Sequence, residues 1–391
     1  MLPYKSICLF AVLLVGVTIS VRSHAASLKF VDLDAGSHVS SALGLSPKGD
    51  VVGWGAFNGG STITPGQWQG NVFTALPSLG GAAGEARAAN NAGQVVGDAS
   101  VEGDRYRHAA SWVNGSVTDL DTLGGHFSGA TAINASGQIA GWSSTRADEA
   151  VHAVLWTDGM ATDLAPLGGN AAAAAAINSR GEVVGLSSTA VDGEYKATLW
   201  SNGGAMALGS LGGTHSAATA INDAGLVAGM STTASDAARR ATLWLGGVAT
   251  DLGTLGGSNS YASGINNAGQ VVGWAGIAGD TAQHATLWGG QGAVDLNSLV
   301  STSVRDAGWV LYNASAIDDQ GDIVGRAYNM FTGANDGFLL QDAGTSVSPV
   351  PQPATWAILL VGLCIVGGAG HRQQETLPIR VSDALKRAPE V

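Results

Sequence analysis

The sequence repeats itself every 44 residues over most of its length. A tryptophan and a turn glycine each recur six times in this step, and a leucine followed by two glycines recurs five times. The tryptophans are Trp68, Trp112, Trp156, Trp200, Trp244 and Trp288, and the turn glycines are Gly49, Gly93, Gly137, Gly181, Gly225 and Gly269. Three markers in one register identify a repeat protein, in which each unit buries its apolar face against the next.

One repeat contains four short runs that are typical of β-strands. In the third copy they are Ala130–Ile133, Gln138–Trp142, His152–Trp156 and Met160–Leu164. The first two runs are joined by a turn that starts with a short polar residue and has glycine three positions later, which is typical of a tight hairpin. The starting residue is Ser46, Asn90, Asn134, Asn178, Asn222, Asn266 and Asp318 in the seven copies. No run has the period of an amphipathic helix.

Four antiparallel strands in about 44 residues match the size of one blade of a β-propeller. The alternative is a β-solenoid or another stacked-hairpin array, which needs shorter coils and a parallel stack. We therefore predict an all-β fold, a seven-bladed β-propeller of four-stranded blades, over residues 26–342.

The number of strands indicates how such a ring is closed. The first hairpin occurs seven times, the last at Ile317–Gly325 after an eight-residue insertion around Val300–Tyr312. The third strand of the last copy is Phe338–Leu340, and its fourth strand is missing. Leu28–Leu33 at the other end of the repeats matches the fourth-strand pattern. We expect this N-terminal strand to close the ring and cover an exposed edge.

The segments outside the repeats predict export. Residues 1–25 have a basic start, the apolar run Ile7–Val21 and a small-residue cleavage site, as in a secretory signal peptide; a membrane anchor is the alternative. Residues 343–354 form a Pro- and Ser-rich linker, 355–370 an uncharged apolar run and 371–391 a polar tail. We expect an apolar helix at each chain end, the C-terminal one in the membrane before processing.

Composition narrows the possible partners and chemistry. The two cysteines, Cys8 and Cys364, lie in the two apolar end segments, so the repeat domain has no disulfide. The formal net charge is −12, without the basic footprint of a nucleic-acid-binding protein. We therefore expect no nucleic-acid partner.

The repeat text resembles the HAF-type extracellular repeat over essentially Leu28–Leu340. The resemblance is carried by Asp251–Gly257 (DLGTLGG) and His284–Trp288 (HATLW), which recur in nearly every copy. It implies an exported bacterial protein and supplies no catalytic residues.

The C-terminus resembles a PEP-CTERM sorting signal. The matching residues are Val350, Pro351, Pro353, Ala354, Thr355 and Trp356, followed by the apolar run and the basic stop His371-Arg372. Gln352 stands where that family has Glu, and the polar tail is longer than usual. The resemblance implies exosortase-type sorting machinery as a partner and a location in the cell envelope, at the cell surface or outside the cell.

Histidine, tryptophan and aspartate recur at fixed positions of the repeat and are candidate site residues. His108, His152 and His284 share a register with Lys196 and Arg240, so we expect side chains that pack beside the tryptophans and not metal ligands. We interpret the tryptophans as core between blades, with a sugar platform as the alternative. Aspartates precede leucine in the fourth strand, and we expect them to accept turn or neighbouring-blade N–H groups; they are Asp32, Asp119, Asp163, Asp251 and Asp295.

A second set of aspartates recurs in the loop between the second and third strands. Its members are Asp104, Asp148, Asp192, Asp236 and Asp280. On one face of a closed ring they would form an acidic crown, and we name them as candidate Ca²⁺ ligands because Ca²⁺ prefers several oxygen ligands. The alternative is that they are solvated turn residues.

From the sequence we expect a non-enzymatic binding and scaffold module with a polysaccharide or a surface protein as its partner. No Ser/His/Asp set, metal-spaced His pair or cysteine site is present in the repeats. The alternative is an extracellular propeller hydrolase or lyase acting on polysaccharide, with the insertion Val300–Tyr312 folded over the central channel. Fold alone does not decide between them.

Overall fold

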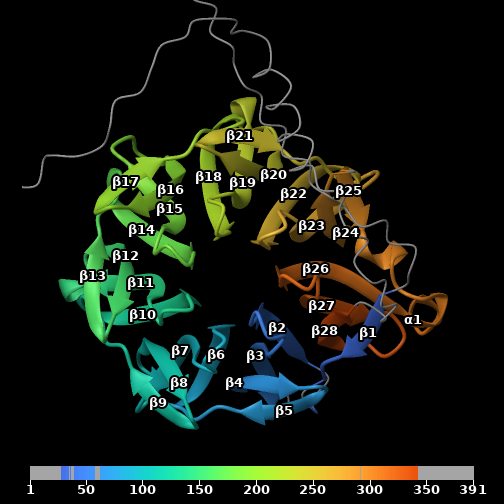
Figure 1. The fold of residues 1–391 in the computed structure, drawn as a ribbon, viewed down its shortest axis with the longest axis horizontal. Coiled ribbons are helices and arrows are strands. Elements are labelled where there is room, and N and C mark those ends of the chain that lie inside the picture. Colours follow the sequence, from blue (N-terminus) through green and yellow to red (C-terminus); the bar gives the residue numbers. More distant parts are fainter. Residues whose placement is uncertain (1–27, 35, 37–38, 58–61, 291, 342–391) are drawn as a thin grey trace, which may run out of the picture. The chain divides into compact units, whose positions relative to one another are not determined.

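A computed structural model of the chain describes residues 28–34, 36, 39–57, 62–290 and 292–341 (Figure 1). The predicted signal peptide, linker, C-terminal apolar helix and polar tail lie outside these residues. The chain divides into two compact units, Met1–Ala343 and Gly344–Val391. Within the described residues, no helix combines the length and apolarity needed to cross a membrane.

The described residues form an all-β fold of five four-stranded sheets and one eight-stranded sheet. The eight-stranded sheet consists of two four-stranded antiparallel sheets that meet through one parallel bridge, between Val151 and Ala171. We number the four-stranded sheets 1 to 7 by the position of their first hairpin. Their size and antiparallel order are consistent with propeller blades.

The strands follow one another in chain order within each sheet. Sheet 1 contains β2 (Ser40–Leu45), β3 (Val51–Phe57), β4 (Thr62–Gln69) and β5 (Val72–Ala75). Sheet 2 contains β6 (Gly80–Ala89), β7 (Val95–Val101), β8 (Arg107–Val113) and β9 (Ser116–Asp119). Sheet 3 contains β10 (Gly124–Ile133), β11 (Ile139–Thr145), β12 (Val151–Thr157) and β13 (Met160–Leu164). Sheet 4 contains β14 (Gly168–Ile177), β15 (Val183–Thr189), β16 (Tyr195–Ser201) and β17 (Gly204–Ala207).

The remaining sheets follow the same plan, with one exception at the end. Sheet 5 contains β18 (Gly212–Ile221), β19 (Val227–Thr233), β20 (Arg239–Leu245) and β21 (Val248–Asp251). Sheet 6 contains β22 (Gly256–Ile265), β23 (Val271–Ile277), β24 (Gln283–Gly289) and β25 (Gly292–Asp295). Sheet 7 contains β26 (Trp309–Ile317), β27 (Ile323–Asn329), β28 (Asn335–Gln341) and the N-terminal β1 (Lys29–Asp32). The short helices are η1 (Arg146–Asp148), η2 (Ala234–Asp236), η3 (Leu296–Ser298) and α1 (Thr302–Asp306).

The hairpin between the first and second strands is built as its sequence predicts. In sheet 3, the amide N–H of Gly137 donates to the carbonyl oxygen of Asn134 at 3.1 Å. The side-chain oxygen of Asn134 accepts the N–H groups of Ser136 and Gln138 at 3.1 and 3.0 Å. Gly137 has φ +82°, a value that glycine adopts without a steric cost. These turns hold the first strand of each sheet nearest the centre in Figure 1.

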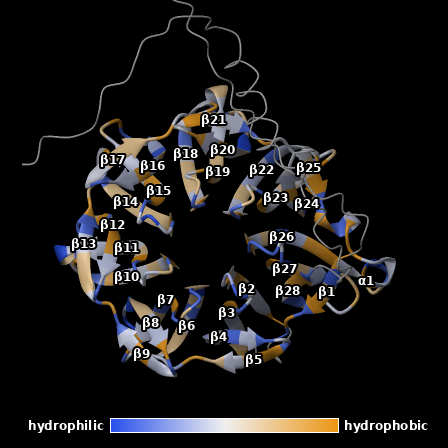
Figure 2. Ribbon diagram, in the orientation of Figure 1, coloured by the Kyte–Doolittle hydropathy of each residue, from blue (hydrophilic) through white to orange (hydrophobic). Residues whose placement is uncertain are grey.

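The hydrophobic core lies between neighbouring sheets, and Figure 2 shows apolar residues in every sheet. Between sheets 2 and 3, Val96 and Ala109 pack against Ile139 and Trp156, which is 1 % exposed. The indole N–H of Trp156 donates to the carbonyl oxygen of Leu120 at the end of sheet 2, at 2.9 Å. All six recurring tryptophans are buried core residues, as the sequence predicted. The indole N–H groups of Trp112, Trp156, Trp200 and Trp244 also bond the sheet before, whereas those of Trp68 and Trp288 have no partner among the described residues.

Strand β1 supplies the fourth strand of sheet 7, as predicted for Leu28–Leu33. It pairs antiparallel with β28, from Lys29 opposite Gln341 to Asp32 opposite Phe338. Ser40 of sheet 1 joins sheets 7 and 1: its hydroxyl accepts Gly337 N–H and donates to Leu33 O, both at 2.9 Å.

The same bridge occurs at an internal junction. Ser260 of sheet 6 accepts Ala241 N–H at 2.9 Å and donates to Gly253 O at 2.8 Å. Sheets 7 and 1 therefore meet through the same pair of hydrogen bonds as sheets 5 and 6.

Candidate functional site

The predicted acidic register lies in the loops between the second and third strands, but its carboxylates face their own sheets. In sheet 3, Asp148 Oδ1 accepts the backbone N–H of His126 at 2.8 Å, and Oδ2 bonds the Nδ1 of the same histidine at 2.6 Å. His126 belongs to the first strand, β10. The Asp148 carboxylate thus links the loop between β11 and β12 to the start of β10 by hydrogen bonds.

Three other sheets repeat this contact. Asp104 accepts from Ala82 N–H at 2.7 Å, Asp236 from Thr214 N–H at 2.9 Å and Asp280 from Ser258 N–H at 2.6 Å. All four aspartates have positive φ, between 52° and 57°. Asp tolerates this region better than most residues, because its short side chain bonds nearby backbone.

In sheets 2, 3, 5 and 6, the second residue of the glycine pair that begins the first strand makes room for the carboxylate. A Cβ added to Gly125 would lie 2.6 Å from Asp148 Oδ1 and 2.2 Å from Ser144 Oγ. At Gly257 the nearest atom would be Asp280 Oδ1, at 2.5 Å. The glycine pair and the loop aspartate are therefore two halves of one contact.

The hydrogen bonds favour the charged carboxylate. Bonds from Ser144 and His126 lower the pKa of Asp148 to about 2. Bonds from Thr232 and Thr214 likewise lower the pKa of Asp236, and bonds from the Ser258 hydroxyl and N–H lower that of Asp280. The lowered pKa values keep these carboxylates ionised at neutral pH.

Asp192 breaks the register. In sheet 4 the loop turns at Gly193, with φ +76°, and Asp192 does not have the positive φ of its four counterparts. Among the described residues, no three His, Cys, Asp or Glu side chains are grouped so as to hold a metal ion. Asp104, Asp148, Asp236 and Asp280 are thus each bonded within their own sheet, and Ca²⁺ binding by this set of aspartates stays a prediction.

The recurring histidines have partners that the sequence analysis missed. His108 Nδ1 lies 2.8 Å from Asp119 Oδ2, and His284 Nδ1 lies 2.7 Å from Asp295 Oδ2. His152 makes the same contact with Asp163 at 2.9 Å. The sequence analysis expected these histidines to pack beside the tryptophans and did not predict that they pair with a carboxylate across the third and fourth strands.

The fourth-strand aspartates also accept turn N–H groups, as predicted. Asp119 accepts from Asp121 N–H at 2.7 Å, and Asp295 accepts from Asn297 N–H at 2.9 Å. In each of these sheets the aspartate follows the histidine by 11 residues, and this constant spacing was the signal for the pairing. The spacing shows that the two side chains meet only when the pairing of the third and fourth strands is known.

The turn asparagines form a belt, the second set that the sequence analysis did not recognise. Each side-chain amide donates to the backbone carbonyl of the corresponding turn residue in the next sheet. The bonds are Asn90 to Asn134 (3.3 Å), Asn134 to Asn178 (3.1 Å), Asn178 to Asn222 (3.3 Å), Asn222 to Asn266 (3.1 Å) and Asn266 to Asp318 (2.9 Å). Between sheets 1 and 2 the link comes from a lysine: Lys48 Nζ in the turn of sheet 1 donates to Asn91 O in the turn of sheet 2, at 2.6 Å.

The belt surrounds a cavity of about 220 Å³ that turn residues of all seven sheets line. This volume is below the range of about 300–1,000 Å³ that is usual for small-molecule sites. Polar groups around it, such as Asn222 and Asp318, are used within the turns. Burial raises the pKa of Asp318 despite the backbone N–H groups it accepts. We assign this cavity a structural role.

Comparisons with known proteins give no family. No protein-family model matches the chain, and no curated protein matches it. Among solved structures, the chain is similar to TolB from Acinetobacter baumannii, with a TM-score of 0.39 and 12 % sequence identity over 64 % of each chain. The chain thus spans less than two thirds of that protein's length, and the likeness assigns neither a family nor an activity.

Proposed function

We propose that the chain is a seven-bladed β-propeller, closed by its N-terminal strand, that is exported and acts as a non-enzymatic binding and scaffold module. The asparagine belt carries this proposal, because it joins successive sheets by buried hydrogen bonds around a common centre. Such a body is rigid at its centre and leaves its loops free to vary. That division suits a surface that presents binding loops.

Closure is supported by the junction between the first and last sheets. Leu33 is fully buried and packs with Ala42 and Trp68 of sheet 1 and with Leu339 of sheet 7. Because β1 covers the edge of β28, the last sheet ends in a short outer strand as the other sheets do.

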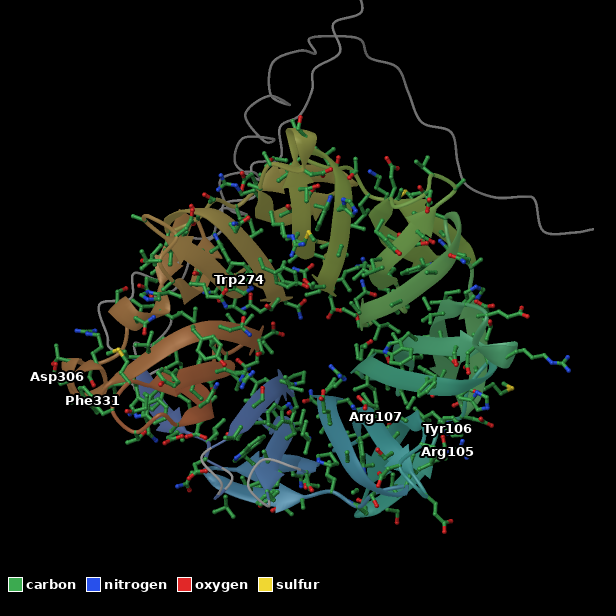
Figure 3. The ribbon with its side chains drawn as sticks, turned by 180° about the vertical axis from the view of Figure 1, so that it is seen from behind. Arg105, Tyr106, Arg107, Trp274, Asp306 and Phe331 are labelled. Atoms are coloured by element: carbon green, nitrogen blue, oxygen red, sulfur yellow. The ribbon has the colours of Figure 1, made fainter. Side chains whose placement is uncertain are left out.

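The polysaccharide hydrolase or lyase alternative depended on the insertion before β26. In Figures 1 and 3, α1 and Asp306 lie at the outer edge of the first compact unit, away from its centre. Arg305 of this helix donates to the backbone oxygens of Asn297 and Val300, at 3.0 and 2.6 Å. Its charge is thus used to hold the insertion in place, which favours the binding module.

Export and sorting rest on the chain ends. The secretory pattern of residues 1–25 and the PEP-CTERM-like residues Val350–Trp356 lead to the proposal that exosortase-type machinery processes the chain at the membrane. Expression with an epitope tag inserted after Gly203, in an exposed hairpin, tests it by fractionation. A cytoplasmic location of the tag would contradict export.

Binding is tested by screening the purified full chain against glycans and against the surface of cells that lack the gene. We expect saturable binding and no consumption of substrate. Because the loop aspartates are used within their own sheets, we expect equal binding with Ca²⁺ and with NaCl of matched ionic strength. Release of new reducing or unsaturated sugar ends would instead support the enzyme alternative.

A further inference from the structure

A cavity of about 480 Å³ lies between sheets 5 and 6, and it falls within the size range of small-molecule sites. It is on the side of the loops between second and third strands, opposite the belt cavity. Arg239 of sheet 5 lines it together with residues of sheet 6. Those residues include Asn259, Trp274, Gly276, Asp280 and Gln283.

Gly276, which lines the cavity, lacks the side-chain hydroxyl that sheets 2 to 5 have at the same position. At this register, Ser144 Oγ accepts Phe127 N–H at 3.0 Å, Ser188 Oγ accepts Ala171 N–H at 2.9 Å and Thr232 Oγ1 accepts His215 N–H at 3.2 Å. In those sheets the hydroxyl fills the space between second and first strands. At Gly276 this hydroxyl is missing, and an added Cβ would lie 3.0 Å from Asp280 Oδ1 and 3.4 Å from the backbone oxygen of Asn259, the counterpart of His215.

Sheets 1 and 3 also have a tryptophan at the position of Trp274, but among the described sheets only sheet 6 has a tyrosine to stack on it. Trp274 is half-buried and stacks on Tyr261, with ring planes 7° apart and centroids 6.3 Å apart. Sheets 4 and 5 have Leu186 and Met230 at the tryptophan position. Figure 3 shows Trp274 away from the outer edge of its sheet. A fixed indole gives the cavity a flat apolar surface.

Polar donors stand around this surface. Asn259 Oδ1 accepts the backbone N–H of Arg239 at 2.9 Å, which leaves the amide nitrogen of Asn259 as its free end. Among the described residues, the Arg239 guanidinium and the Gln283 amide have no hydrogen-bond or ion-pair partner. Asp280 is already held by Ser258, at 2.6 and 2.5 Å. The groups available to a ligand are therefore mainly donors, one of them cationic.

From these contacts we infer that the cavity binds a saccharide unit that carries a carboxylate, such as one uronic acid of a polysaccharide. The apolar face of the sugar ring packs on Trp274, and the amides of Asn259 and Gln283 donate to its hydroxyl oxygens. Arg239 pairs with the carboxylate, for which the planar guanidinium offers two parallel N–H groups. This inference names the ligand and the site of the proposed binding module and rests on that proposal.

The test measures binding of tetragalacturonate to the purified full chain by calorimetry, with the fully methyl-esterified oligomer as the neutral control. Gly276→Ser restores the hydroxyl of the neighbouring repeats at the cavity wall, beside Asp280 and Asn259, and we expect it to weaken binding. It should fold, because Thr232 and Asp236 already make the required contact in sheet 5 at 2.5 Å. Trp274→Leu, the residue of sheet 4, and Arg239→Gln should each weaken binding about tenfold.

Gly204→Ser in β17 is the matched control, since its added atoms would meet no neighbour closer than 3.8 Å at Cβ. It should bind as the unchanged chain does. The inference is overturned if tetragalacturonate does not bind, or if Gly276→Ser and Trp274→Leu bind it equally well. Binding that persists in these variants would exclude this cavity but leave the binding module intact, whereas loss of all glycan and cell-surface binding would refute the module itself.

Discussion

At the residue scale, the second glycine of the Leu-Gly-Gly sequence leaves room for the loop aspartate in sheets 2, 3, 5 and 6. At Gly213 an added Cβ would lie 2.1 Å from Thr232 Oγ1 and 2.7 Å from Asp236 Oδ1. The conformation of Gly213 does not require glycine, because its φ is not positive. The requirement is therefore space for the carboxylate and the hydroxyl.

Gly213→Ala is expected to destabilise the fold by about 1–3 kcal/mol, the usual cost of forcing atoms into a filled site. The free energy of unfolding is measured by denaturant titration of the full chain. Gly204→Ala is the control, because its Cβ would have no neighbour closer than 3.8 Å, and it should change stability by less than about 0.5 kcal/mol. Equal effects of the two changes would show that the close approach at Gly213 is not a constraint.

The His284–Asp295 pair gives stability a defined pH dependence. The bond to Asp295 raises the pKa of His284. Burial alone would raise the pKa of Asp295, but bonds from His284 and Asn297 outweigh it and lower the pKa. A raised histidine pKa stabilises below its unfolded value of about 6.5, and a lowered aspartate pKa stabilises above its unfolded value of about 4.

The contribution of the pair is therefore largest between about pH 4.5 and 6.5, and it is lost as the pH rises through the folded pKa of His284. His284→Gln should cost about 0.5–1 kcal/mol more at pH 5.5 than at pH 8.5. Thermal unfolding of both proteins at the two pH values measures this difference. A larger cost at pH 8.5 would mean that the neutral imidazole, and not the ion pair, stabilises the hairpin.

At the scale of elements, the turn between first and second strands has two separate tasks. The side-chain oxygen of Asn222 closes its own turn by accepting Ala224 and Leu226 N–H, at 3.1 and 2.9 Å. Its amide nitrogen donates to Asn266 O in the next sheet at 3.1 Å. An aspartate at this position can still accept the two turn N–H groups, but its ionised carboxylate cannot donate to Asn266 O. Asn222→Asp therefore removes the link between sheets and leaves turn closure intact.

Asn222→Asp is expected to cost about 1–3 kcal/mol, because a buried acceptor loses its donor and a carboxylate replaces it. Part of this loss should be recovered at acidic pH, where the protonated carboxyl donates again. Asn202→Asp is the control: Asn202 lies in an exposed turn of sheet 4, and sheet 3 has Asp158 at the same position. This change should leave the free energy of unfolding nearly unchanged. Urea unfolding at pH 4 and pH 7 compares the variants, and equal costs for both would remove the belt from the account of stability.

At the scale of the whole molecule, the 44-residue step predicted the strands, the turns and the tryptophan core, because these depend on residues close together in the chain. The donor strand Leu28–Leu33 was also found, since its pattern matches other fourth strands. The sequence did not predict which side chains at different positions of the repeat contact one another. Pairing of His152 with Asp163 requires the strand register, and the fastening of Asp148 beside Gly125 requires the course of the loop.

The cavity between sheets 5 and 6 was missed for a different physical reason. Gly276 looks like one more glycine in a glycine-rich chain. Its difference from the other sheets appears only when Ser144, Ser188 and Thr232 are seen to bond the first strand at the same position. A residue that differs from the other copies of a repeat can be recognised as a candidate site only when the contacts made at that position in those copies are known.

The junction of the two chain ends provides the last prediction. Phe30 of β1 packs against Trp309 and Phe338, with ring centroids 5.6 and 6.4 Å away, and Leu33 is fully buried. Deleting residues 26–33 from the full chain should therefore cost about 3–5 kcal/mol and expose the edge of β28 to self-association.

A synthetic peptide of residues 26–34 should reverse both effects, because it can pair with the free edge and stabilises only the folded chain. The same peptide with Leu33→Asp is the control, since a buried charge without a partner prevents docking. Light scattering and thermal unfolding of the deleted chain, with each peptide, measure the rescue. If the deleted chain stays monomeric and unfolds at the temperature of the intact chain, β1 is not what joins the last sheet to the first.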